Sequence, residues 1–335
     1  MRGVGKIILV LILFVVKSFP MAAQTPTELK ANGDLILTQH WEIPTLLNPA
    51  STGNTDFFRF RAAGRIEHLG NYDAPKFFNI AIDAPFKVME RNIGAGLIAQ
   101  YSTEKYLKNV LIALQGSYHA DLGSGKFNFG VRLGYRRINF EGDKINDINI
   151  LPDREEDANG MMFSKKQKGN IDLGVGLGYD HPFFHIRVSG LNLLKADIKL
   201  SENQENNETT SYVIYSIPRG FYFDTGGNIE LKNTLFTLQP SVLLMTDFHE
   251  FNSLVEMRAT YNNKLTFGID YRWKAAFGLM AGISLKNFYI GYAWEYVNVA
   301  NAGGSAGNHE LVLGYQFKLD RGKKVRYSRK SIRLM

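Results

Sequence analysis

The chain has 335 residues, enough for one large barrel or two soluble domains, and it contains no cysteine, which excludes disulfides, thiolate nucleophiles, a lipobox anchor and cysteine metal sites. Its net charge of +7 comes from the ends, because residues 1–23 hold three basic side chains, residues 321–335 hold seven, and neither range holds an acidic one. The other 29 of the 39 basic side chains are outnumbered by 32 acidic ones, so the body of the chain does not have the charge of a nucleic-acid-binding protein.

Residues 1–23 have the features of a Sec signal peptide. Arg2 and Lys6 precede an apolar run over residues 7–16, and small residues end the segment at Ala22-Ala23. We predict cleavage after Ala23. No later stretch approaches the roughly 18 uninterrupted apolar residues of a membrane-spanning helix. If the exported chain is integral to a membrane, we therefore expect it to be a β-barrel.

The next segment, residues 24–56, does not have the pattern of a strand. It contains Trp41, the run Leu46-Leu47-Asn48-Pro49-Ala50, and Gly53. Asn-Pro pairs begin turns, and the large apolar side chains need a place to be buried. We predict a plug-like N-terminal segment, periplasmic or tucked into the barrel mouth. The alternative is a disordered leader, because chain termini are commonly loose.

From Phe57 to Leu319, apolar residues alternate with small or polar ones, the period of a strand with one apolar face. The clearest cases are residues 127–136, 171–180 and 308–317. This pattern predicts an all-β fold, a single transmembrane antiparallel β-barrel over residues 57–319 with roughly 14 strands. The strands are expected near residues 57–62, 77–86, 93–101, 110–119, 127–136, 171–180, 183–191, 218–231, 235–244, 254–261, 265–274, 276–285, 288–296 and 308–317.

The connections between these strands alternate in length. Short turn sequences are expected at 121–125, 180–182, 232–233, 262–263 and 286–287, and long polar connections at 141–168, 193–210 and 298–307. Outer-membrane barrels have short periplasmic turns and longer outer loops. Because the short and long connections alternate in this order, both termini are expected in the periplasm. The basic tail, residues 320–335, is then periplasmic. It is either a solvated end or a surface that attracts an acidic partner or lipid headgroups.

Charged residues fall on the face of the strands that points away from lipid. Charges would be costly toward lipid but can pair or hydrate inside a barrel. They indicate either a charged substrate path or, as we favour, a packed interior joined by salt bridges. The predicted interior charges are Arg59, Arg61, Arg132, Arg136, Asp172, Asp270, Arg272 and Glu295.

No pattern of catalytic, cofactor-binding or metal-binding residues stands out. The seven histidines are scattered, and Asp247 with His249 has no serine in a recognisable nucleophile motif. Glycines 174, 176 and 178 recur at period two without the helix that phosphate binding needs. We therefore assign no catalytic, cofactor or metal residues and predict that the protein is not an enzyme.

Several short motifs resemble the PorP/SprF family, which comprises type IX secretion system membrane proteins of the Bacteroidetes. Leu37-Thr38-Gln39, Leu46–Ala50 and Gly53 are similar to the N-terminal signature of the family. Ala74-Pro75-Lys76 with Asp83-Ala84-Pro85 fits its next stretch, and residues 307–317 resemble its closing strand. The resemblance covers residues 34–319. The chain departs from the pattern at two places. It has His40-Trp41 where the family usually has Tyr, and Gly64-Arg65 where the family often has Gln-Trp.

The resemblance implies an outer-membrane barrel that works with the type IX secretion apparatus. Such a protein supports the export or surface attachment of secreted proteins such as gliding adhesins. Its expected partners are outer-membrane lipid, periplasmic and outer-membrane secretion components, and an exported cargo protein, but not nucleic acid. An alternative is an outer-membrane channel for uptake of small or hydrophobic molecules. A lipid-modifying enzyme would need a serine–histidine pair at the lipid boundary, which the sequence does not suggest.

Overall fold

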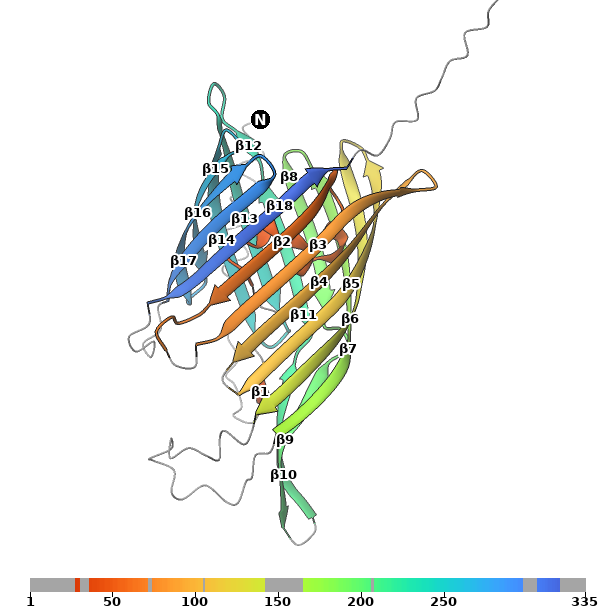
Figure 1. Ribbon diagram of the computed structural model, residues 1–335, viewed down its shortest axis with the longest axis vertical. Coiled ribbons are helices and arrows are strands. Elements are labelled where there is room, and N and C mark those ends of the chain that lie inside the picture. Colours follow the sequence, from red (N-terminus) through yellow and green to blue (C-terminus); the bar gives the residue numbers. More distant parts are fainter. Residues whose placement is uncertain are drawn as a thin grey trace, which may run out of the picture.

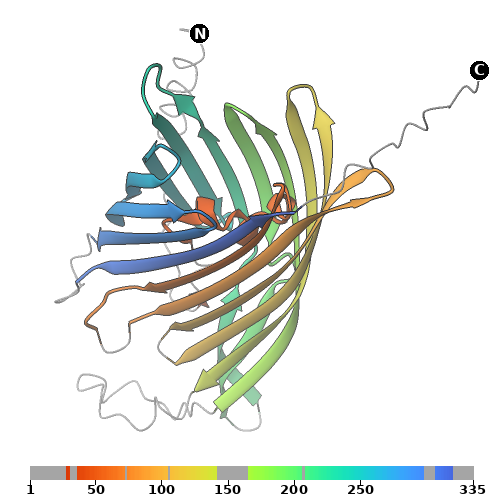
Figure 2. The same ribbon diagram turned by 45° about the horizontal axis from the view of Figure 1, so that its top comes forward.

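The computed structural model describes residues 28–30, 36–71, 74–104, 106–141, 165–205, 208–297 and 306–319. In this part of the chain, fourteen antiparallel strands form one closed barrel (Figures 1 and 2). The strands are β2 (Phe57–Ile66), β3 (Lys76–Val88), β4 (Arg91–Glu104), β5 (Leu107–Leu122), β6 (Gly125–Glu141), β7 (Lys165–His181), β8 (Phe184–Leu191), β11 (Gly220–Gly227), β13 (Phe236–Thr246), β14 (Phe251–Tyr261), β15 (Leu265–Arg272), β16 (Ala276–Leu285), β17 (Phe288–Val297) and β18 (Asn308–Lys318).

Each strand pairs with the next in the chain, and β18 pairs with β2 to close the cylinder. No helix among the described residues is long and apolar enough to cross a membrane. The closing contact is visible in Figure 1, where the blue β18 lies beside the brown β2. The barrel predicted from the period-two alternation is confirmed.

The alternation also fixes which side chains face outward. In β6, Leu133 is 62 % exposed whereas its neighbour Arg132 is fully buried, and in β18 Leu311 and Leu313 are exposed whereas Val312 is buried. Successive side chains of a strand point to opposite faces, so the whole wall is apolar outside and mostly polar or small inside. Aromatic rings gather where strands end, as in the stacked pair of Phe58 and Phe317, whose ring centroids are 5.0 Å apart.

The barrel has a short-turn rim and a long-loop rim. The short-turn rim carries the start of β2, the end of β18 and two-residue turns such as 89–90 and 286–287. The opposite rim carries longer connections, including 192–219 between β8 and β11. Three of its connections, 105–106, 247–250 and 273–275, are short, so the alternation of lengths is looser than the sequence predicts. The signal peptide, the basic tail and residues 142–164 lie outside the described residues.

The long polar connection predicted at 193–210 is present, but most of it forms strands and not an irregular loop. β9 (Ala196–Glu205) and β10 (Glu208–Ile217) make an antiparallel hairpin at the long-loop rim, and the three-residue β1 (Glu28–Lys30) pairs in parallel with β10. The prediction that residues 24–56 contain no strand is therefore also corrected. Near the base of the hairpin, Ile198 and Tyr215 pack against Phe140 of β6. The single strand expected over 218–231 is divided into β11 and the two-residue β12 (Ile229–Glu230).

Residues 36–56, here called the inner segment, form three 3-10 turns: η1 (His40–Glu42), η2 (Pro44–Leu46) and η3 (Pro49–Ser51). Pro44 and Pro49 open two of them, and proline suits the first position of a helical turn because it has no N–H to leave unpaired. The segment contacts strands on every side of the closed wall, so it lies within the barrel (Figure 2). For these residues the disordered-leader alternative is wrong.

Candidate functional site in the barrel interior

The inner segment packs against an apolar band on the inside of the wall. Leu37, Ile43 and Leu46 form one buried cluster with side chains from β2, β3, β4, β5, β17 and β18. Leu47 joins a second cluster with residues of β8, β11, β13 and β14. These inward apolar positions interrupt the otherwise polar lining. Contact with these positions removes four large apolar side chains of the inner segment from water. This burial is the main non-directional contribution that holds the inner segment in place.

Four inward glycines make room for the inner segment, Gly94 and Gly130 for its backbone and Gly176 and Gly291 for its side chains. A β-carbon built on Gly94, Gly130, Gly176 or Gly291 would overlap Thr52, Pro49, Asn48 or Gln39 respectively. These residues are here called the seat glycines. The sequence places Gly176 on the inner face correctly, but only the structure gives its purpose, which is room for the Asn48 side chain of the inner segment.

Acidic side chains of β17 and β18 bind the start of the inner segment. The backbone N–H groups of Thr38 and Gln39 donate to the Glu310 carboxylate over 2.7 and 2.8 Å. The Thr38 hydroxyl donates to Glu295 over 2.6 Å, and Arg65 pairs with the same carboxylate at 2.6 Å. Hydrogen bonds to ionised groups are about twice as strong as neutral ones, so this cluster anchors the segment firmly.

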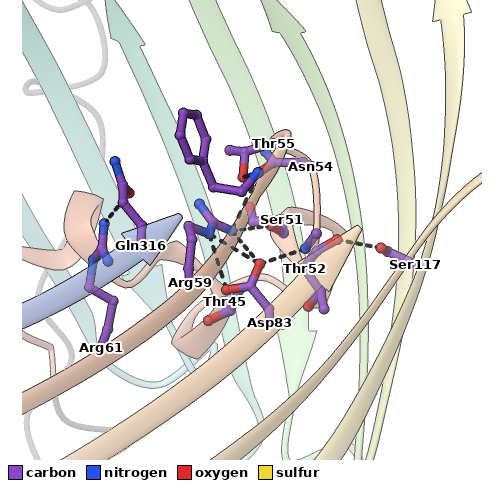
Figure 3. Close-up of polar contacts among 12 residues, drawn as sticks. Thr45, Ser51, Thr52, Asn54, Thr55, Arg59, Arg61, Asp83, Ser117 and Gln316 are labelled. Atoms are coloured by element: carbon purple, nitrogen blue, oxygen red, sulfur yellow. Dashed lines mark hydrogen bonds and ion pairs between the residues drawn. The ribbon is translucent and has the colours of Figure 1, made fainter. Parts of the chain in front are cut away.

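The end of the inner segment is bound by an ion pair between β2 and β3 (Figure 3). Arg59 Nη2 lies 2.7 Å from Asp83 Oδ2 and donates to the Ser51 carbonyl over 3.0 Å. The same carboxylate oxygen accepts the N–H of Gly53 over 2.7 Å. Gly53 has a φ of +58°, so its left-handed backbone turns the segment toward the start of β2. Arg59 and Asp83 therefore position both the turn and the barrel strand that follows it.

A third anchor lies on β6, β7 and β8. Asp172 accepts from Arg132 Nε over 2.9 Å and from Arg136 Nη2 over 3.1 Å. The Ser189 hydroxyl donates to the Leu47 carbonyl, and the Asn48 side chain donates to the backbone carbonyls of Leu177 and Val188. Asn48 also caps η3 by accepting from the Ala50 N–H over 2.8 Å. The Asn-Pro pair thus both forms a turn and ties it to the wall.

The predicted interior charges are largely paired, as the packed-interior alternative expects. Arg61 contacts Glu42 at 3.2 Å and Arg272 contacts Glu295 at 3.0 Å. Asp270 differs, because its buried carboxylate accepts no hydrogen bond from the described residues. Sequence reasoning missed Arg65 and Glu310, although both fall on the inward phase of their strands.

His40 places a buried positive charge between two strands. Its Nδ1 lies 3.3 Å from Glu256 Oε1 and its Nε2 lies 3.7 Å from Asp224 Oδ1. Burial alone would lower the pKa of His40, but the carboxylates of Glu256 and Asp224 raise it to about 10. The neighbouring Trp41 ring lies 4.1 Å from the guanidinium carbon of Arg258. At neutral pH, His40 is therefore a cation that ties the inner segment to β11 and β14.

Ser117, His119 and Asn128 have the geometry of a hydrolase triad. Asn128 donates to Asp180 over 2.6 Å, and its Oδ1 lies 2.6 Å from His119 Nδ1. His119 Nε2 lies 2.9 Å from Ser117 Oγ and 3.0 Å from the Thr52 carbonyl oxygen. However, the Ser117 hydroxyl donates to the Thr52 carbonyl over 2.5 Å and is covered by the inner segment (Figure 3). The arrangement binds a backbone carbonyl and offers no accessible nucleophile.

Metal binding has no support in the described residues, which contain no group of three or more histidine and carboxylate side chains placed to hold an ion. The interior is instead a binding surface for polypeptide. Carboxylates receive backbone N–H groups, hydroxyls and arginines receive backbone carbonyls, and glycines leave space for the main chain. What this surface holds is a segment of the same chain.

Comparison with known proteins gives one family. The model of the family described as type IX secretion system membrane protein PorP/SprF matches residues 29–315. No curated relative matches the chain.

Solved outer-membrane proteins are similar in shape at low identity. A Pseudomonas aeruginosa FadL homologue is 12 % identical with a TM-score of 0.49, covering 82 % of this chain and 93 % of its own. The TodX deltaS2S3 mutant, a monoaromatic hydrocarbon channel, is 10 % identical with a TM-score of 0.47, covering 89 % and 97 %. The Acinetobacter baumannii outer membrane protein Omp33 is 9 % identical with a TM-score of 0.42, covering 78 % and 97 %. Likeness at this level carries no argument about function.

Proposed function

The chain belongs to the PorP/SprF family of type IX secretion system membrane proteins, and from that premise we propose that it is a closed outer-membrane barrel that supports the export or surface attachment of secreted proteins such as gliding adhesins. The family places the barrel in the outer membrane and associates it with secretion. The cargo and the manner of support belong to the proposal, as does the absence of enzymatic activity.

The observation that carries this proposal is the occupied interior. The inner segment is fixed at its start by Glu310, near its middle by Asn48 and at its end by Asp83, and apolar side chains fill the space between these anchors. We infer that a lumen filled in this way is closed to solutes. The barrel then acts through the surfaces at its two rims, where other proteins can bind.

At the short-turn rim the proposed contact is the basic tail, residues 320–335, which continues from the end of β18. Its seven basic side chains, at 321, 323, 324, 326, 329, 330 and 333, suit an acidic surface of a periplasmic secretion component. At the long-loop rim, the hairpin of β9 and β10 is the proposed contact for the exported cargo or for another outer-membrane component of the system.

Purification of the full-length protein from envelope membranes tests the proposal. We expect periplasmic and outer-membrane secretion components to be recovered with it, and deletion of residues 321–335 to reduce recovery of the periplasmic ones. A variant of unchanged length, with the seven basic residues replaced by glutamine, separates charge from length. Unchanged recovery of every partner removes the tail from the mechanism. Failure of the intact protein to recover any secretion component contradicts the proposal as a whole.

A second candidate is a channel for small or hydrophobic molecules, favoured by the arginines that line the interior. Planar-bilayer conductance distinguishes the two functions. A steady open pore in the intact protein would support a channel, whereas a closed barrel supports the secretion role. The ion pairs that occupy those arginines, such as Arg59 with Asp83 and Arg132 with Asp172, favour the closed barrel.

A further inference from the structure

The hairpin of β3 and β4 projects from the short-turn rim. Its two strands pair as far as Val88 and Arg91, whereas β2 pairs with β3 only as far as Asp83. Residues 84–88 of β3 therefore extend past the neighbouring strand, and the orange hairpin reaches away from the barrel wall in both views (Figures 1 and 2). The contacts described above between the wall and the inner segment do not involve its turn, residues 89–90.

This turn has a backbone that its sequence does not favour. Met89 and Glu90 have φ values of +47° and +66°, so both are left-handed, as a two-residue turn of type I′ requires. Such turns prefer Asn-Gly, because Asn and Gly adopt this conformation at little cost. Among the other described residues at this rim, the left-handed positions hold Gly123, Asn233, Asn262, Asn263 and Lys286. A strained turn built from two poorly suited residues is a reason to look for a use of their side chains.

The side chain at the end of the turn is apolar. Met89 is 91 % exposed, the largest exposed fraction among the large apolar residues that the structure describes. Exposed charged side chains surround it, with Lys87 and Arg91 in the two strands and Glu90 in the turn. Charges of this kind do not suit the hydrocarbon of a membrane. An apolar pocket in another protein suits the tip better, because a flexible methionine fills irregular spaces.

We propose that the tip of this hairpin docks on a periplasmic secretion component, with Met89 in an apolar pocket and acidic side chains of that partner against Lys87 and Arg91. The proposal rests on the secretion role above and names a second contact at the rim where the basic tail begins. Leu319 leaves the barrel beside Asp56, and the seven basic residues of the tail follow it. The tail and the tip are thus both cationic, and one acidic partner surface can bind the two together.

Purification of the full-length protein from envelope membranes tests the tip, with the periplasmic secretion components identified and quantified by mass spectrometry. Met89→Asn combined with Glu90→Gly removes the apolar side chain but installs the preferred turn, so the barrel should unfold at an unchanged or higher temperature. Recovery of the periplasmic components should nevertheless fall about tenfold, as expected for loss of a buried anchor. Lys87→Gln combined with Arg91→Gln should lower recovery less and make it less dependent on salt.

Lys286→Asn combined with Asn287→Gly is the matched control. It changes the turn between β16 and β17 at the same rim in the same way, and it also removes a basic side chain. Recovery of the periplasmic components should be unchanged. Equal recovery with the tip variant and with this control overturns the proposal. If that happens while the unaltered protein still recovers its partners, the tip is excluded and the secretion role stands.

Site-specific crosslinking identifies what touches the tip. The chain has no cysteine, so Met89→Cys carries a single thiol-linked benzophenone in intact envelopes. Crosslinking to a periplasmic secretion component supports the proposal, and Asn287→Cys with the same label should not give that product. Crosslinking of the Met89 label to phospholipid alone overturns the proposal, because the tip would then belong to the lipid-facing wall.

Discussion

Replacing Gly130 with alanine should push the inner segment off the wall and open the lumen to ions. A β-carbon at this position overlaps the carbonyl carbon of Pro49 and the amide nitrogen of Ala50, which are backbone atoms of η3 and cannot rotate away. Overpacking of this kind costs about 1 to 3 kcal/mol. A loss of about 1.4 kcal/mol multiplies the population of the displaced state tenfold, so a cost of about 2 kcal/mol multiplies it roughly thirtyfold.

Conductance across planar bilayers measures that population directly. The unaltered protein should be closed, and Gly130→Ala should show open events whose frequency rises by roughly the factor above. Gly116→Ala is the outward control, because a β-carbon there meets no atom within 4 Å. Gly178→Ala is the inward control, since its nearest neighbour is the flexible Arg187 side chain at 3.3 Å. Equal conductance and equal thermal stability in all three variants would refute the seat-glycine argument.

Three further predictions concern the polar anchors. The pKa of His40 is raised to about 10 from an ordinary 6.5, so its contribution to the free energy of unfolding is complete below pH 6.5 and is lost as the pH rises through about 10. The loss is up to about 1.4 kcal/mol per pH unit. Denaturant unfolding should show this slope in the intact protein and not in His40→Gln. Glu310→Ala should destabilise by about 2 to 6 kcal/mol in the same assay, since it leaves two buried backbone N–H groups without their acceptor, at about 1 to 3 kcal/mol each, while Arg65 keeps Glu295; Glu230→Ala at an exposed position should stay within about 0.5 kcal/mol. Ser117→Ala should cost about 1 kcal/mol through one lost hydrogen bond, and hydrolysis of a p-nitrophenyl ester that depends on Ser117 would contradict its purely binding role.

The barrel could be predicted from the sequence because its signal is local and repeated. Apolar and polar residues alternate along consecutive positions, as over residues 127–136, and only the apolar face of such a strand can contact lipid. The hairpin of β9 and β10 was missed for the same reason. Its sequence from Ser201 to Thr210 is wholly polar and does not alternate, and its apolar contacts with β6, such as those of Ile198 and Tyr215 with Phe140, lie only near its base.

The interior site could be predicted only in part. The sequence predicts a turn at Asn48-Pro49 and inward-pointing side chains at Arg59 and Arg132. It does not predict which residues these side chains contact. Arg65 meets Glu295 and Glu310 across 230 and 245 residues of chain, and period-two alternation reports the face of a residue but not its height along the barrel. Ser117 and His119 are two positions apart in one strand, so their side chains point to the same inward face. This spacing was the only feature of the sequence that could have indicated the cluster.

The wall and the inner segment satisfy each other's polar groups, and this argues that they are one folding unit. Without the segment, Glu310 and Asp83 would lose backbone N–H donors, and the apolar band around Leu111 and Val312 would line an open lumen. Without the wall, the three 3-10 turns have too few internal hydrogen bonds to persist, since such turns are stable only in short supported pieces. A water-filled channel has no reason to keep apolar positions inside. Their presence favours a lumen built to be filled, with function carried by the rims.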